Sequence, residues 1–202
     1  TTTTSLESTS TTSFTTIITT TETSSSTTTT TTTVTISTTT TTTTMAILKY
    51  TLASSNPSFA PRSGHALVSH DNKVWLIGGK GNSILYNDVW YTTDMISWTQ
   101  ATSNAGFSPR WGHAVYSYNS KLWVIAGSTN ANYYGTNDVW SSTNGIDWVL
   151  VTNQIFAGGG TRCSHGGYVF DNKMWIVSGV INAGANVTND SMWSTNGYVW
   201  TV

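Results

Sequence analysis

Short apolar runs separated by turn residues recur along the chain after its first 44 residues. Residues 65–70 and 74–77 are apolar and β-branched, and Asp71-Asn72 between them favours a tight turn, so we predict a β-hairpin. Two further strand-like runs follow, near residues 87–92 and 96–100. Because no window shows sustained helical periodicity, the pattern predicts an all-β protein.

This four-strand pattern occurs three times, with a period of about fifty residues. Each copy contains an arginine followed three residues later by a histidine, and the arginines recur at spacings of 48 and 52 residues. Repeats of this kind bury their apolar faces against one another. We therefore predict two regions, residues 1–44 and 45–202, the second divided at about 50–97, 98–147 and 148–202. The repeated pairs are Arg62 and His65, Arg110 and His113, and Arg162 and His165.

In the first repeat the hairpin ends at Gly78-Gly79, followed by Asn-Asp-Val-Trp at residues 87–90 and a closing Trp98. This order resembles the kelch repeat, and the resemblance extends from Tyr50 to the end of the chain. Kelch repeats form the blades of β-propellers. The resemblance therefore implies three kelch-like four-stranded propeller blades, as a partial or open propeller.

The third repeat departs from the other two because Met192 stands where they have Trp90 and Trp140. Three blades are also fewer than the roughly four to eight of a closed propeller. A lone strand is predicted at residues 47–52, and the chain does not begin with Met. We expect a piece of a larger protein, or a subunit that completes its sheets with a neighbouring copy, because open strand edges invite pairing.

The first 44 residues contain 28 threonines and eight serines. Such a segment buries too little apolar surface to offset the entropy of ordering, while β-branched threonine favours extended backbone. We predict an extended, O-glycosylated stem that contributes to assembly, with a flexible linker as the alternative. The candidate O-glycosylation sites are Thr27, Thr28, Thr29, Thr30, Thr31, Thr32, Thr33, Thr38, Thr39, Thr40, Thr41, Thr42, Thr43 and Thr44.

Charged residues make up only 8% of the chain, and its net charge is −1. Nucleic acids and anionic membranes require clustered lysine and arginine, so neither is an expected partner. No apolar run approaches the length of a membrane span. Asn186 and Asn189 lie in Asn-x-Ser/Thr motifs, which favours an extracellular, glycosylated protein.

Each repeated arginine has an aspartate in its own repeat, and we predict structural ion pairs between them. An arginine cluster like that of sialidases is the alternative. The three histidines would form a metal ring if they pointed to a common axis. Half-buried imidazoles that are hydrogen-bonded to backbone explain their repetition better, and we expect no metal or cofactor. The aspartates are Asp88, Asp138 and Asp190.

Galactose oxidase has blades of this type, but its copper site requires a Tyr cross-linked to a Cys. Cys163 stands in a repeat position filled elsewhere by Ser63 and Trp111, so the resemblance does not extend to that site. The repeats contain no glutamate and no convincing acid and base pair. We therefore predict that the protein is not an enzyme.

Three aromatic residues outside the regular positions, Trp111, Tyr133 and Tyr134, are candidates for stacking on sugars. The predicted function is an extracellular structural glycoprotein, a filament or surface-coat subunit that assembles through its Thr-rich segment and its β-edges. The alternatives are a carbohydrate-binding or adhesion module, and a non-catalytic fragment of a secreted kelch-type oxidase or sialidase-like hydrolase.

Overall fold

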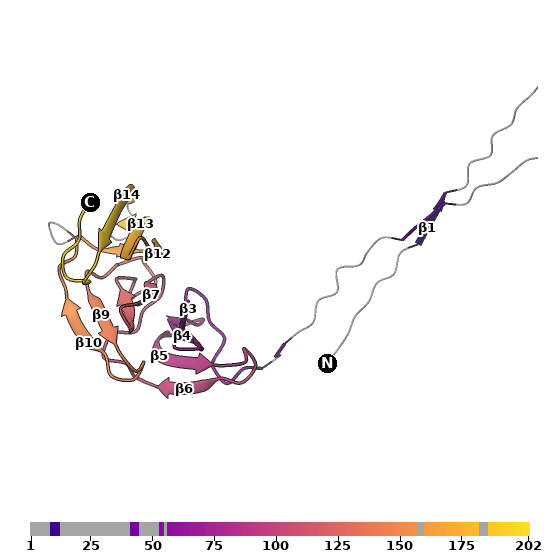
Figure 1. Ribbon diagram of the computed structural model, residues 1–202, viewed down its shortest axis with the longest axis horizontal. Helices are drawn as coiled ribbons and strands as arrows, with labels where there is room; N and C mark the ends of the chain where they lie inside the picture. Colours follow the sequence, from indigo (N-terminus) through magenta and orange to yellow (C-terminus); the bar gives the residue numbers. More distant parts are fainter. Residues whose placement is uncertain (1–8, 13–40, 45–52, 55, 157–159, 182–185) are drawn as a thin grey trace, which may run out of the picture. The chain divides into compact units, whose positions relative to one another are not determined.

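The computed structural model describes residues 9–12, 41–44, 53–54, 56–156, 160–181 and 186–202. The chain divides into two compact units, Thr1–Leu52 and Ala53–Val202. Every regular element within the described residues is a β-strand, which confirms the all-β prediction for this part of the chain (Figure 1).

In the first unit, β1 (Thr9–Thr12) pairs antiparallel with β2 (Thr41–Thr44), so that Thr9 lies opposite Thr44. The sequence did not predict this pairing, and the glycosylated stem of residues 1–44 stays a prediction. The candidate sites at 27–33 and 38–40 and the lone strand predicted at 47–52 lie outside the described residues.

The second unit contains three antiparallel four-stranded sheets, which we call the first, second and third blades. The first has the sheet order β3 (Ala66–His70), β4 (Lys73–Lys80), β5 (Leu85–Thr92), β6 (Thr99–Thr102). The second has the order β7 (Ala114–Tyr118), β8 (Lys121–Ile125), β9 (Val139–Ser142), β10 (Val149–Thr152). The third combines β11 (Arg162–Cys163), β12 (Gly166–Phe170), β13 (Lys173–Ile181) and β14 (Asn186–Ser194).

These sheets agree with the prediction of three kelch-like blades, and they do not close into a ring within the described residues. Each hairpin turn has two consecutive residues of positive φ, such as Asp71 and Asn72, as the sequence predicted. Strand β14 places Met192 opposite Ile176, while β5 places Trp90 opposite Leu76. Met192 therefore occupies the strand position of Trp90.

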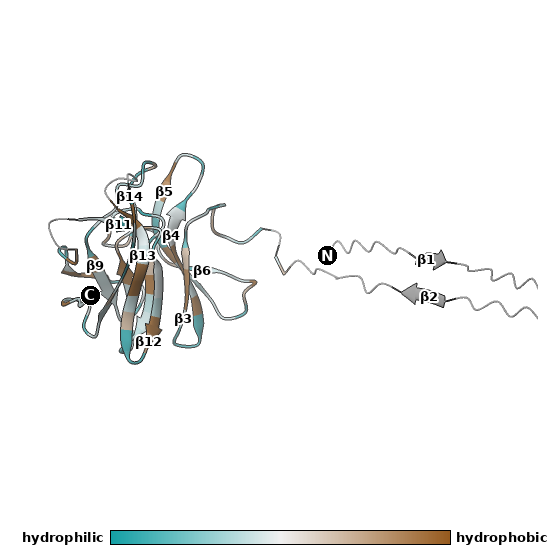
Figure 2. Ribbon diagram, turned by 90° about the horizontal axis from the view of Figure 1, so that it is seen from above, coloured by the Kyte–Doolittle hydropathy of each residue, from teal (hydrophilic) through white to brown (hydrophobic). Residues whose placement is uncertain are grey.

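The hydrophobic core lies between consecutive blades, and the inner strands β3, β7 and β12 lie next to one another (Figure 1). Hydrophobic residues are also concentrated on β12 and β13 (Figure 2). The core cluster between the first two blades includes Trp75, Ile77, Val89, Phe107, Leu122, Val124 and Trp148. The cluster between the last two includes Tyr116, Tyr118, Trp123, Ile125, Val139, Ile155, Phe156, Met174, Ile176 and Met192.

A glycine turn of each later blade packs on a tryptophan of the blade before it. A β-carbon on Gly145 would lie 2.1 Å from Cζ3 of Trp75, and one on Gly197 would lie 2.3 Å from Cζ3 of Trp123. Both glycines also have positive φ, 73° and 72°. A side chain at either position would therefore force the blades apart.

Backbone hydrogen bonds join consecutive blades near the ends of their second strands. The amide of Gly79 donates to the carbonyl of Arg110 at 2.8 Å, and the amide of Gly127 donates to the carbonyl of Arg162 at 2.9 Å. Each acceptor belongs to the arginine at the start of the following blade. The arginine of one blade is thus connected to the glycine of the preceding blade.

Candidate functional site

The Arg110–Asp138 pair lies within the second blade. Nη1 and Nη2 of Arg110 donate to the two carboxylate oxygens of Asp138 at 2.7 and 2.8 Å. Nη1 also donates to the carbonyl of Ala126 at 2.8 Å, and Ala126 has a φ of 53°. Burial raises the pKa of Asp138, but the hydrogen bonds and charge of Arg110 outweigh it and hold that pKa below its ordinary value.

The other two blades repeat this arrangement. Nη1 of Arg62 lies 2.6 Å from Oδ1 of Asp88, and Nη1 of Arg162 lies 2.8 Å from Oδ1 of Asp190. The structure therefore brings together each of the three predicted pairs, and every arginine of the chain is engaged with a carboxylate of its own blade. An arginine set free to bind an anion, as in sialidases, is not available here.

Each of the three histidines packs against a glycine near the end of the second strand of its own blade. A β-carbon on Gly127 would lie 2.6 Å from Cβ of His113, and His65 and His165 lie similarly against Gly79 and Gly179. This contact gives a physical reason why a histidine recurs opposite a glycine in every blade. The histidines therefore contribute to the packing within each blade.

Both ring nitrogens of His113 and His165, and Nδ1 of His65, are buried, and none of them makes a hydrogen bond of good geometry among the described residues. Burial, aided by the charge of Arg110, lowers the pKa of His113 to about 3, which keeps it neutral at pH 7. The backbone of Ile77 lies close enough to the His113 ring to counteract part of the fall in its pKa. Within the described ranges, no three His, Cys, Asp or Glu side chains are grouped so as to hold a metal.

Trp111 is not available as a platform for sugars. It is buried, Nζ of Lys80 lies 3.6 Å from its ring centroid, and the ring of Tyr133 lies 4.9 Å away. Its Nε1 donates to the carbonyl of Asn130 at 2.8 Å. The prediction for Trp111 is therefore corrected, whereas Tyr133 and Tyr134 are exposed.

Cys163 is fully buried, and its Sγ lies 3.7 Å from the carbonyl of Tyr133. Burial raises the pKa of its thiol, so the thiolate is disfavoured. Asn186 and Asn189 are both exposed on β14. Their side chains are therefore accessible to modification, while the Cys163 thiol is not.

The outer side of the third blade is a candidate interaction site that the sequence did not reveal. Tyr168 and Phe170 on β12 are 72% and 67% exposed, whereas Tyr116 and Tyr118, at the same positions of the second blade, are 1% and 5% exposed. We call this surface the open face and define it by Tyr168, Phe170, Trp175 and Val177. The sequence contained a sign of this site, because the repeat spacing of 52 residues places Tyr168 and Phe170 at the positions of Tyr116 and Tyr118.

The boundary between the second and third blades shows how such a face is covered. The hydroxyl of Tyr116 donates to the carbonyl of Trp175 at 2.8 Å, and that of Tyr118 donates to the carbonyl of Asn172 at 2.8 Å. These tyrosines thus combine apolar burial with hydrogen bonds to the next blade. The open face offers the same kind of surface without a cover among the described residues.

Comparison with known proteins agrees with the repeats of the sequence. Residues 61–91 match the family model described as Kelch motif, which spans the first blade from the residue before Arg62 to β5. No curated protein matches the chain. No helix in the described part of the chain is long and apolar enough to cross a membrane. The Kelch motif, together with the three four-stranded sheets, indicates a β-propeller protein-interaction module, a class that is generally non-catalytic.

Proposed function

We propose that this chain is a non-catalytic structural module that assembles with copies of itself through the open face of the third blade. The exposure of Tyr168 and Phe170, whose equivalents Tyr116 and Tyr118 are buried at a blade boundary, carries the proposal. Exposed apolar surface of this kind marks interaction sites. Within this chain, the equivalent face of the second blade is covered by the third blade.

The first blade of a second copy is the proposed occupant. Its front surface contains Leu67, which is 50% exposed, whereas the equivalent Val115 packs into the core between the first two blades. Contact between an open face and such a front surface is head-to-tail, and it propagates as a filament unless the rotation closes.

The proposed contact differs from the internal blade boundaries at one position. Met95, with a φ of 62°, occupies the turn position at which Gly145 and Gly197 pack on tryptophans. Docking of a copy therefore requires Trp175 to turn aside from Met95. This makes the contact between copies weaker than the contact between blades of one chain.

We further propose that the assembly is an extracellular, glycosylated filament or surface coat. The 28 threonines of the first 44 residues, the low charge of the chain and the exposed Asn186 and Asn189 support this proposal. Covalent sugars would supply the solubility that the few charged residues do not. In this arrangement the tract presents glycans, and the blades make the contacts.

Sedimentation velocity of the full chain over a range of concentrations tests the assembly. We expect the wild type to form larger species as concentration rises, and the double variant Tyr168→Ser with Phe170→Ser to remain monomeric. Tyr134→Ser, which alters an exposed tyrosine on a loop outside the open face, is the matched control. A monomeric wild type, or a double variant that associates as strongly, would refute the proposal.

Two further variants identify the surfaces involved. Met95→Gly restores the glycine turn and should strengthen association, which only contact with the first blade of a copy predicts. Deletion of residues 1–44 should leave association intact, because contacts through the open face do not involve the tract. If the deletion alone abolishes association, copies assemble through the Thr-rich segment instead.

A further inference from the structure

The first two blades each contain a box of three aromatic rings. Phe59 lies edge-on to Trp98 with centroids 5.1 Å apart and to Trp90 at 6.2 Å. In the second blade the corresponding distances are 5.1 and 6.4 Å, between Phe107 and its partners Trp148 and Trp140. The same geometry therefore occurs twice.

One indole of each box also donates a hydrogen bond to the carboxylate of the ion pair. Nε1 of Trp90 donates to Oδ2 of Asp88 at 2.7 Å, and Nε1 of Trp140 donates to Oδ2 of Asp138 at 2.7 Å. The carboxylate oxygen thus receives both a guanidinium and an indole hydrogen. In both of these blades the box therefore holds an indole whose N–H is hydrogen-bonded to the aspartate.

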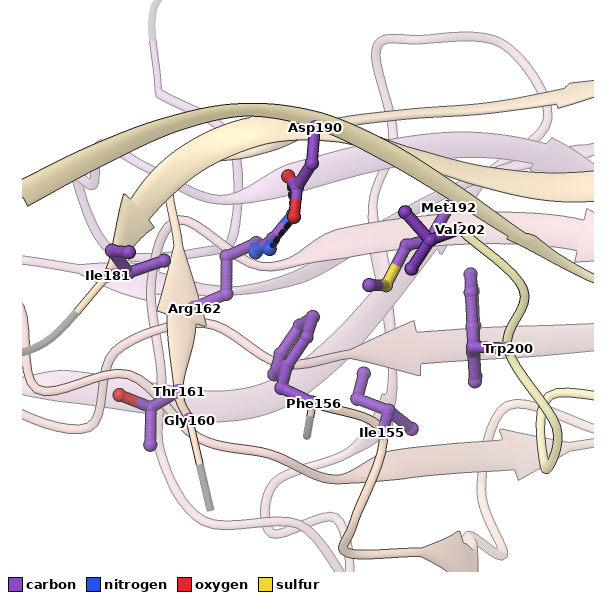
Figure 3. A pocket seen from close by; sticks show the side chains of 10 residues that line it. All are labelled: Ile155, Phe156, Gly160, Thr161, Arg162, Ile181, Asp190, Met192, Trp200 and Val202. Atoms are coloured by element: carbon purple, nitrogen blue, oxygen red, sulfur yellow. Dashed lines mark hydrogen bonds and ion pairs between the residues drawn. The ribbon is translucent and has the colours of Figure 1, made fainter. Parts of the chain in front are cut away.

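In the third blade the corresponding place is a pocket of about 440 Å³ (Figure 3). Phe156 and Trp200 are present, but Met192 replaces the indole, and thioether sulfur is no hydrogen-bond donor. The pocket is lined mainly by apolar side chains around the ion pair of Arg162 and Asp190, and its volume is in the range typical of small-molecule sites.

The carboxylate of this pocket lacks a partner that its equivalents have in the other blades. Asp190 accepts the two hydrogen bonds of Arg162 but none from an indole, and its side chain is 32% exposed, against 11% for Asp88. An N–H donor bound in the pocket would supply the hydrogen bond that Asp190 lacks.

We propose that this pocket binds a small planar aromatic molecule of the indole type, which places its N–H on Oδ2 of Asp190 and its ring against Phe156 and Trp200. The first two blades provide the template, since the same surroundings hold an indole there. The pocket lies on the side of the third blade that faces the second, because Phe156 and Met192 belong to the cluster between them. It is therefore separate from the open face and independent of the proposed assembly.

Fluorine NMR of 5-fluoroindole with the full chain tests the proposal. We expect saturable line broadening, and binding of 1-methyl-5-fluoroindole that is about 10- to 100-fold weaker because it lacks the N–H. Met192→Trp supplies the missing ring from the chain itself, so this variant should melt at a higher temperature and lose binding. Val187→Ala, at an exposed position of β14, is the control and should bind as the wild type does.

Three outcomes would overturn the proposal: no saturable binding to the wild type, equal binding of the methylated probe, or undiminished binding to a folded Met192→Trp variant. Competition with a short tryptophan-containing peptide separates two sources of the same ring. Displacement of 5-fluoroindole would identify a tryptophan side chain as a ligand, and failure to displace it would leave free indole-type molecules. Both results require the pocket to hold an indole.

Discussion

Replacement of Arg110 by alanine tests whether the ion pair within each blade stabilises the fold. The side chain of Arg110 is fully buried, and alanine would leave the carboxylate of Asp138, only 17% exposed, without its cation. It would also leave the carbonyl of Ala126 without its donor. Removing one partner of a buried ion pair costs about 3–5 kcal/mol. For a module of this size we therefore expect the melting temperature to fall by roughly 6–20 °C.

Circular dichroism melts of the full chain provide the measurement, with two comparisons. Lys173→Ala removes a pair with Asp171 whose side chains are 25% and 68% exposed, so the melting temperature should not change. Arg162→Ala should have a smaller effect than Arg110→Ala, because solvent reaches Asp190 more readily. If Arg110→Ala melts as the wild type does, the pairs do not brace the blades.

Acid titration, glycine substitution and glycopeptide analysis test other parts of the molecule. Burial and Arg110 lower the pKa of His113 to about 3 from an unfolded value of about 6.5, so the unfolded chain binds more protons between these values. The free energy of unfolding should therefore fall as the pH drops from 6.5 to 3, by at most about 1.4 kcal/mol per pH unit from this residue. Urea unfolding of His113→Gln should show a shallower dependence, and an unchanged slope would contradict the assignment. Gly145→Ala should lower the melting temperature through its clash with Trp75, whereas Gly166→Ala, whose nearest neighbour atom would lie 3.6 Å away, should not; equal melting of the two would refute the packing argument. Glycopeptide mass spectrometry of native protein should find several sugar additions between residues 1 and 44, and a bare tract would exclude the glycosylated role.

The repeat made much of the fold predictable from the sequence. Each repeat contains an arginine and an aspartate at matching positions, and two opposite charges can be buried only when they pair with each other. Strand positions could also be transferred between blades, which correctly placed Met192 at the strand position of Trp90. These inferences succeeded because blades with the same residue pattern bury the same surfaces.

Other features depend on contacts that one block does not reveal. Trp111 is buried by Lys80, a residue of the preceding blade, so its local sequence gives no sign of that cover. A uniform run of threonines contains no apolar alternation to fix a register, and therefore did not predict that Thr9 lies opposite Thr44. The buried ring nitrogens of His113 and His165 lack hydrogen bonds of good geometry, whereas our expectation rested on the general rule that buried polar atoms are hydrogen-bonded.

The backbone hydrogen bonds between blades run both ways. Gly79 and Gly127 donate to the carbonyls of Arg110 and Arg162, and the amides of Arg110 and Arg162 donate back to the carbonyls of Tyr86 and Thr136. Arg110 and Arg162 each stabilise their own blade through the side chain and contact the preceding blade through the backbone. Loosening of Arg162 therefore exposes the Gly127 amide to solvent exchange, while loosening of Arg62 leaves that amide protected. Opening of one boundary therefore breaks backbone hydrogen bonds of both blades that meet there.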